Sequence, residues 1–182
     1  MHFTRQRSLF IVALAVLVTA GCAGFFEHPG TPLGQAADRG DLAAVKALLA
    51  QGADAGAFDE SGQTALHWAA RGGGPAGPHR DRPASAERLA VIAALLDGGA
   101  NVNAVDRRPH YVGGSSGWTP LVLALHHQQF GAAALLLERG ADPNIRSNEG
   151  MSAMEMASVE GAPADLLALL TAKGFREAAR TR

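Results

Sequence analysis

The histidines are the side chains of this 182-residue sequence that most readily suggest acid–base or metal chemistry. His126 and His127 stand together at the end of an apolar segment with the composition of a helix. Adjacent helical residues point about 100° apart, whereas a zinc-binding pair on one helix needs i, i+4 spacing. We therefore expect no metal ion and no cofactor at this pair. A histidine-based metalloenzyme is the alternative from a different functional class.

Serine and glycine clusters give no stronger indication of catalysis. Ser115 and Ser116 lie in a Gly-rich segment without the strained strand-to-helix turn that presents a nucleophilic serine, and no Asp–His partner can be assigned to them. The glycines at 72–74 are not followed by Lys-Ser/Thr and follow no predicted strand, so they do not form a phosphate-binding loop. We expect no catalytic residues and no enzymatic activity.

Cys22 is the only cysteine and suggests a different kind of chemistry. Residues 1–21 combine Arg5 and Arg7 with an apolar run at 9–18 and small residues before Cys22, which is typical of a secretory signal peptide. Residues 18–22 also resemble the bacterial lipobox, in which the cysteine is lipidated, although Thr19 stands where Leu is commoner. We expect lipidation of Cys22, a tether at 22–30, and an outer-membrane anchor facing the periplasm of the bacterial envelope. An ordinary cleaved signal peptide is the alternative.

A recurring phrase organises the remainder of the chain. Thr-Ala-Leu-His-Trp-Ala-Ala at 64–70 has related phrases that begin at Thr31, Thr119 and Ser152, and two of the intervals are 33 residues. Thr and Ser are favoured helix N-caps, so each phrase predicts the start of a short helix. A second apolar run with a leucine pair follows each phrase, at 48–49, 95–96, 136–137 and 169–170. Three of these runs end in Gly-Ala-Asp or Gly-Ala-Asn, where the glycine predicts a helix stop.

This pattern resembles the ankyrin-repeat family, whose unit is a turn, two antiparallel helices and an extended finger, with a period of about 33 residues. The resemblance covers residues 31–174 and implies an all-α solenoid of about four helix-turn-helix repeats, followed by a short tail at 175–182. It also implies that His67 is a structural brace between neighbouring turns. Departures from the pattern are Gly34 and Val122 in the histidine slot, Gln128 in the inter-helix glycine slot, and a fourth repeat without the Gly-Ala-Asp ending.

Two insertions explain the one irregular interval, which is 55 residues from Thr64 to Thr119. About 14 extra residues, at 73–86, separate the two helices of the second repeat, and their Gly and Pro content predicts a loop. About 8 more, near 107–114, lengthen the finger between the second and third repeats.

The resemblance implies that a partner protein binds the concave face and the fingers. The net charge of −1 gives no clustered basic surface for nucleic acid, and we expect a monomer that binds another protein. An immunity protein against a toxin delivered to the periplasm and an envelope stress-tolerance factor are alternatives within this class. The alternative to partner binding is packing within the array for Trp118, and a solvated loop without a binding role for Arg108 and Tyr111. The slots of the family place the following residues at the partner surface: Asp38, Arg39, Glu60, Ser61, Gln63, Arg71, Arg107, Arg108, His110, Tyr111, Trp118, His126, His127, Asn148, Glu149, Met151 and Glu160.

Overall fold

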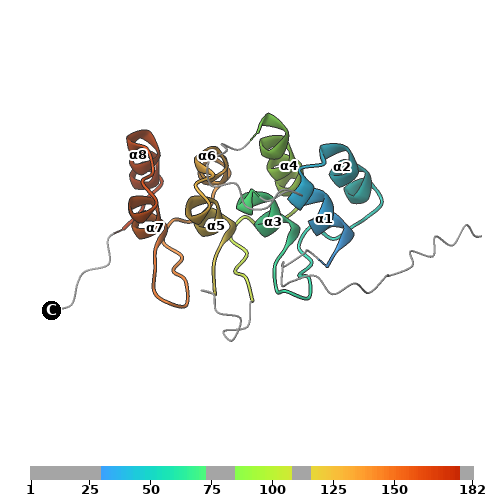
Figure 1. Ribbon diagram of the computed structural model, residues 1–182, viewed down its shortest axis with the longest axis horizontal. Coiled ribbons are helices and arrows are strands. Elements are labelled where there is room, and N and C mark those ends of the chain that lie inside the picture. Colours follow the sequence, from blue (N-terminus) through green and yellow to red (C-terminus); the bar gives the residue numbers. More distant parts are fainter. Residues whose placement is uncertain (1–29, 73–84, 108–115, 177–182) are drawn as a thin grey trace, which may run out of the picture.

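The computed structural model describes residues 30–72, 85–107 and 116–176, and the helices in these ranges form pairs along the chain (Figure 1). Within the same ranges the β-structure consists of one isolated bridge, between Phe58 and Thr64. The prediction of an all-helical repeat array is thereby confirmed. The helices are α1 (Pro32–Arg39), α2 (Leu42–Ala50), α3 (Ala65–Arg71), α4 (Ala86–Asp97), α5 (Pro120–His126), α6 (Phe130–Glu138), α7 (Ala153–Val159) and α8 (Ala164–Ala172).

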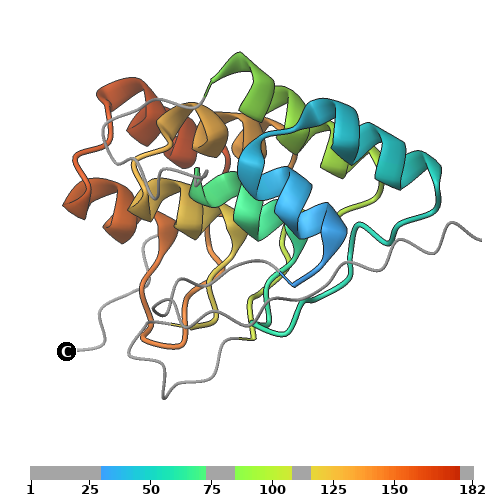
Figure 2. The ribbon, with the colours of Figure 1, turned by 45° about the vertical axis from the view of Figure 1, so that its right-hand side comes forward.

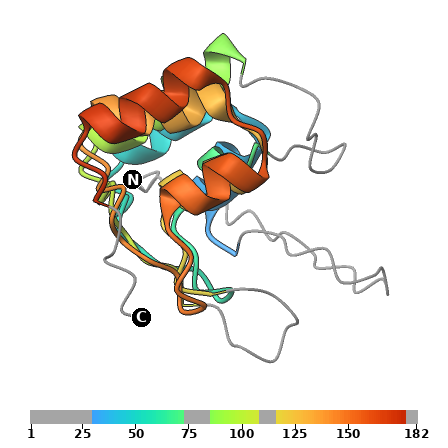
Figure 3. The same ribbon diagram turned by 90° about the vertical axis from the view of Figure 1, so that its left-hand side faces the viewer.

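The helices make two layers. The odd-numbered helices form an inner row in which α3 packs on α1, α5 on α3 and α7 on α5, and the even-numbered helices form a parallel outer row. The view along the array shows the two layers one above the other, with the fingers projecting together from the inner row (Figure 3). The intermediate view shows that the fingers follow one another along the same side of the molecule (Figure 2). None of the helices in the described ranges has both the length and the apolar content that a membrane span requires.

Several helices, including α1 and α5, begin where the sequence places a capping side chain. The hydroxyl oxygens of Thr31 and Thr119 accept hydrogen bonds from the N–H groups of Gly34 and Val122, at 3.0 and 3.3 Å. Proline follows both residues at the first helical position, where its missing N–H group has no partner to lose. These local features explain why helices of only eight and seven residues start at the predicted places.

The core between the layers is aliphatic and rich in alanine. Alanine pairs on the inner helices, such as Ala36–Ala37 and Ala69–Ala70, are at most 1% exposed and allow neighbouring repeats to approach closely. Leu95 and Leu136 on the outer helices are fully buried against them. Because every repeat contributes to one continuous cluster, the stability of each repeat depends on its neighbours.

The turn between the two helices of each repeat needs a left-handed backbone. Gly40, Gly72 and Gly161 occupy this place with φ of 73°, 74° and 71°, and Gln128 occupies it in the third repeat with φ of 56°. Gln128 is the one residue other than glycine with a positive φ in the part of the chain that the structure describes. A side chain in this conformation is strained, so the departure at Gln128 has an energetic cost.

The fourth repeat corrects the predicted alignment by one residue. Ala141 N–H donates to the Leu136 carbonyl at 2.9 Å, and Phe175 N–H donates in the same way to the Leu170 carbonyl at 3.2 Å. Leu170 therefore corresponds to Leu136, and the pair at 169–170 is not the counterpart of the pair at 136–137, because the turn between α7 and α8 is one residue longer. Gly174, with φ of 91°, supplies the helix stop that seemed to be missing.

The predicted tail and the first insertion are also adjusted at their edges. Arg176 N–H donates to the Asn144 side-chain oxygen at 2.8 Å, and Phe175 N–H bonds to Leu170, so residues 175 and 176 join the last repeat and the predicted tail begins after them. Ser85 caps α4, whose first residue is Ala86, so the end of the 73–86 insertion is helical. The remainder of that insertion, at 73–84, lies outside the described residues.

Candidate protein-binding surface

Three extended segments, named here the first finger (53–63), second finger (100–107 and 116–118) and third finger (141–151), carry several of the exposed polar residues. An aspartate shapes the first of them. Asp59 Oδ1 accepts hydrogen bonds from the N–H groups of Ser61 and Gln63 at 2.9 and 3.0 Å, and its Oδ2 accepts from Trp68 Nε1 at 2.7 Å. This carboxylate therefore fixes both the turn at the tip and its position on α3.

Asp106 has the same function in the second finger. Its carboxylate is 4% exposed and accepts hydrogen bonds from the N–H groups of Gly117 and Trp118 at 2.7 and 3.0 Å. Neighbouring fingers are also joined through their backbones, because Arg107 N–H donates to the Gly62 carbonyl at 2.8 Å. Gly62 is required there, since a Cβ atom at this position would lie 2.7 Å from the Arg107 carbonyl carbon. The fingers are consequently a hydrogen-bonded platform.

His67 braces the second repeat against the third. Its Nδ1 atom accepts from the N–H and hydroxyl groups of Thr64, at 3.1 and 2.8 Å, so the proton resides on Nε2. Nε2 lies 3.2 Å from the Trp118 carbonyl oxygen, to which it donates. The imidazole is fully buried, as the structural role predicted for it requires.

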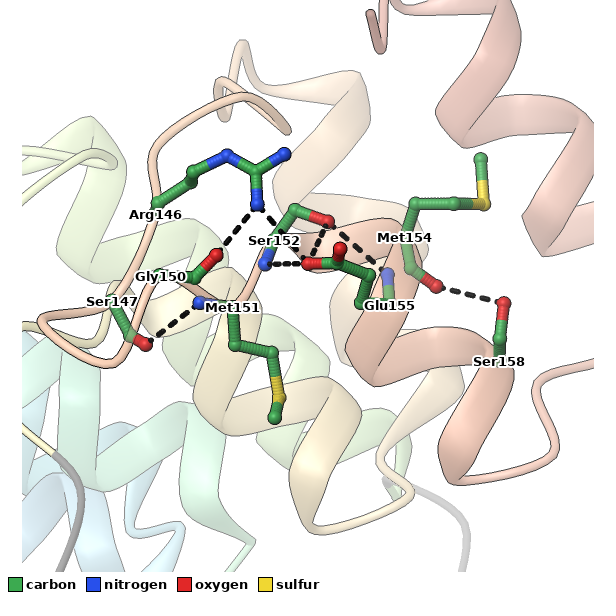
Figure 4. Close-up of polar contacts among 8 residues, drawn as sticks. All are labelled: Arg146, Ser147, Gly150, Met151, Ser152, Met154, Glu155 and Ser158. Carbon is green, nitrogen blue, oxygen red and sulfur yellow. Dashed lines mark hydrogen bonds and ion pairs between the residues drawn. The ribbon is translucent and has the colours of Figure 1, made fainter. Parts of the chain in front are cut away.

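The third finger and α7 are joined by a capping box (Figure 4). Ser152 N–H donates to Glu155 Oε2 at 2.8 Å, and Glu155 N–H donates back to the Ser152 hydroxyl oxygen at 3.2 Å. Arg146 reaches the same carboxylate oxygen at 3.2 Å and also the Gly150 carbonyl. The backbone N–H and hydroxyl of Ser152, followed by the charge of Arg146, hold the pKa of Glu155 below its usual value.

A second polar group links the ends of α5 and α7 on the concave side. His126 Nδ1 lies 3.0 Å from Glu160 Oε1, and Gln128 Nε2 donates to Glu160 Oε2 at 3.2 Å. The His126 ring also meets the Trp118 ring edge-on, with centroids 4.8 Å apart. His126 and Glu160 are thus partly exposed residues that also connect the third and fourth repeats.

The two adjacent histidines differ from the expectation in one respect. Their rings meet edge-to-face with centroids 5.0 Å apart, although adjacent helical residues point about 100° apart. Within residues 30–72, 85–107 and 116–176, no group of three or more His, Cys, Asp or Glu side chains is placed to hold a metal ion.

Most of the predicted partner residues that the structure describes are accessible. Two corrections are required: Gln63 and Trp118 are only 1% and 8% exposed, so neither side chain is available to a partner in this structure. Cys22, Arg108, His110 and Tyr111 lie outside the described residues. The accessible members of the predicted set, exposed or partly exposed, are Asp38, Arg39, Glu60, Ser61, Arg71, Arg107, His126, His127, Asn148, Glu149, Met151 and Glu160.

Glu149 shows how the tip of the third finger is held. Its Oε1 atom accepts from Ser116 N–H at 3.1 Å. Partial desolvation acts to raise the pKa of Glu149, but hydrogen bonds from Ser147, Ser116 and Trp118 outweigh it, so the pKa lies below its usual value. The carboxylate is therefore ionised at neutral pH and presents a fixed negative charge beside the concave face.

Sequence reasoning missed Arg88, which connects the first two repeats. This side chain enters from α4, is 9% exposed, and donates to the carbonyl oxygens of Asp38 at 2.9 Å, Ala69 at 3.3 Å and Ala37 at 3.4 Å. Burial lowers the pKa of Arg88 from its usual value, and the charge of Asp38 partly offsets this effect. No signal in the repeat pattern marks this position, because Arg88 lies in the additional first turn of α4.

Sequence reasoning also missed an open hollow between the first and second fingers. It has a volume of about 510 Å³ and is lined by residues 56, 58, 101 and 103–107. Phe58 forms part of its wall, and the Arg107 guanidinium carbon lies 3.9 Å from the centre of the Phe58 ring. Val105, also in the lining, is 41% exposed.

Comparison with known proteins identifies the repeat. A family model described as ankyrin repeat matches residues 61–107 and 116–148, and one described as ankyrin repeats in many copies matches residues 33–75. Among curated proteins, the Drosophila melanogaster palmitoyltransferase Hip14 is 33% identical over 130 residues, which are 71% of this chain and 17% of that protein. The Mus musculus ankyrin repeat and SOCS box protein 16 is 35% identical over 139 residues, 75% of this chain and 28% of that protein.

A third relative is matched over more residues, and this match also covers only part of that protein. Zygote-specific protein 3 of Chlamydomonas reinhardtii is 32% identical over 165 residues, which are 90% of this chain and 38% of that protein. This chain therefore spans less than two fifths of the length of each of these three relatives, all of which are eukaryotic.

Proposed function

Because the chain belongs to the ankyrin-repeat family, we propose that it is a non-enzymatic module that binds another protein through the concave side of its inner helices and its fingers. Ankyrin repeats are in general protein-binding modules. The observation that carries the proposal for this chain is the accessible row at the ends of the inner helices, where Arg39, Arg71, His126 and Glu160 follow one another from repeat to repeat.

The charge of this row changes along the array. Arg39 and Arg71 give the first two repeats a cationic end, and Glu160 gives the last repeat an anionic end. Arg71 is also oriented by Trp68, since its guanidinium carbon lies 5.3 Å from the centre of that ring. Arginine held on an aromatic ring loses little side-chain entropy on binding, which favours a role in recognition.

A pull-down with the chain from residue 22 onward, followed by calorimetric titration of the protein recovered, tests this proposal. Arg39→Glu and Glu60→Lys alter exposed residues, and we expect each to weaken binding by at least about tenfold, roughly 1.4 kcal/mol. Lys46→Glu, on the exposed side of α2, is the matched control and should leave affinity unchanged. Equal affinity for all three variants would show that the concave side is not the binding surface.

We also propose that the module acts as a monomer and that a lipid on Cys22 anchors it to the outer membrane of the bacterial envelope, where it faces the periplasm. The support comes from the sequence alone, namely the basic start, the apolar run at 9–18 and the position of the only cysteine. Cys22→Ser should abolish incorporation of labelled fatty acid and release the protein from membranes. If the variant still incorporates the label and still sediments with membranes, the lipid anchor is excluded.

A further inference from the structure

The hollow between the first and second fingers presents apolar surface and hydrogen-bond donors. Phe58 and Val105 provide the apolar part, and Val105 is one of two large apolar side chains that are exposed in the described part of the chain. The only acidic residue in the lining is Asp106, whose carboxylate is buried and bonded to Gly117 and Trp118.

The donors come from three side chains. Arg107 is exposed and makes no ion pair with any residue in the described ranges, while its ring contact with Phe58 and its backbone bond to Gly62 fix its position. Asn101 Oδ1 accepts from Asn103 N–H, and Asn103 Oδ1 accepts from Asp142 N–H, at 2.9 and 2.8 Å. Each amide oxygen already accepts one backbone hydrogen bond, and each asparagine also has an NH₂ group that can donate.

Electrostatics support an anionic occupant. A guanidinium bonds most strongly to a carboxylate, and an apolar wall beside it lowers the local dielectric and strengthens that bond. The hollow is open, which suits one side chain of a bound peptide better than a small molecule that must be enclosed. Among the acidic side chains of the surrounding loops, Asp54 and Asp142 bond to backbone N–H groups at the bases of the fingers. Asp59 bonds to Ser61, Gln63 and Trp68, and Glu60 is exposed at the tip of the first finger.

We propose that this hollow is a subsite for a peptide segment of the partner protein that carries a large apolar residue next to Asp or Glu. The apolar side chain packs on Phe58 and Val105, and the carboxylate accepts hydrogen bonds from Arg107 and from the asparagine amides. This inference rests on the proposed function, because it names the chemistry of the partner that the fingers select.

Selection of a random displayed peptide library against the full chain tests the proposal. We expect the enriched peptides to contain Leu, Ile or Phe beside Asp or Glu. Synthetic peptides from this pool should bind Arg107→Glu and Val105→Ala at least about tenfold more weakly than the unaltered chain, and should bind the control Lys46→Glu equally well. Replacing the acidic residue of the peptide by Lys should restore binding to Arg107→Glu.

Each other outcome overturns the proposal. Enrichment of basic peptides, or acidic peptides that bind Arg107→Glu as well as the unaltered chain, would show that the hollow does not select carboxylates. Binding of free acetate or N-acetyl-leucine that competes fully with the peptides would assign the hollow to small molecules. If the recovered partner protein still binds Arg107→Glu normally but not Arg39→Glu, the proposed function stands and the subsite fails. If the partner binds both variants normally, both the subsite and the proposed binding surface are refuted.

Discussion

Replacement of Arg88 by Met measures how strongly one side chain joins the first two repeats. Its guanidinium contacts carbonyl oxygens in the last turns of α1 and α3, where the helix dipole favours a cation. Only the bond to Asp38, at 2.9 Å, is short, and the other two are at the long end of the range. A bond from a charged donor contributes about 1.5–3 kcal/mol, and the cost of burial offsets part of the total, so we expect a loss of about 2 kcal/mol.

Urea denaturation followed by circular dichroism provides the assay. Arg88→Met should lower the free energy of unfolding by about 2 kcal/mol with an unchanged m-value, and Arg88→Lys should have an intermediate effect because a single ammonium reaches fewer carbonyls. The control is Arg139→Met, which removes a partly exposed ion pair with Asp97 and should cost less than about 1 kcal/mol. A loss of under about 0.5 kcal/mol for Arg88→Met would refute the argument that these bonds hold the repeats together.

Three further outcomes are expected. Leu136→Ala should lower the free energy of unfolding by about 2–5 kcal/mol, and Leu170→Ala, at the corresponding place in the last described repeat, should cost less; thermal melts in the opposite order would place the end of the array elsewhere. Gln128→Gly should raise stability in urea melts by up to about 1 kcal/mol by relieving the left-handed strain, and a loss of stability would contradict this and show that the bond to Glu160 contributes more. The lowered pKa of Glu155 means that the stability it contributes is present above its unfolded value near 4.5 and is lost as the pH falls through the folded value. Glu155→Gln should therefore flatten the loss of stability below pH 4.5 in acid titrations, and an unaltered acid profile would contradict the role of the capping box.

The fold was predictable because its determinants are local. A hydroxyl residue precedes each inner helix, and a glycine follows the inner helix in all repeats but the third. The structure places caps at Thr31, Thr119 and Ser152 as predicted. The one-residue shift in the fourth repeat escaped the sequence argument because two leucines at 169–170 imitate the pair at 136–137. Only the bond from Phe175 to Leu170 identifies the correct partner.

The contacts between repeats were less predictable than the repeats themselves. Arg88 reaches carbonyls contributed by residues 19 to 51 positions away, and no periodic pattern encodes such a contact. The burial of Gln63 and Trp118 was also not predicted. Each precedes the threonine that begins an inner helix, and a side chain at this position is exposed or buried according to the side chains of the neighbouring repeat. In this chain the neighbour of Trp118 is the ring of His126.

The same dependence on neighbours determines where a subsite can form. One equivalent position in the three fingers is occupied by Phe58, Val105 and Arg146, respectively. Arg107 lies two residues after that position in the second finger. Between the first two fingers this places a guanidinium over an aromatic ring. Between the second and third fingers Val105 has no such partner, because Arg146 turns instead to Glu155 and the residue in the slot of Arg107 is Asn148, which bonds to Ser116. A repeat array can thus present an apolar and cationic surface at one junction alone, and the subsite proposed for this chain depends on a pair of adjacent fingers and not on any single repeat.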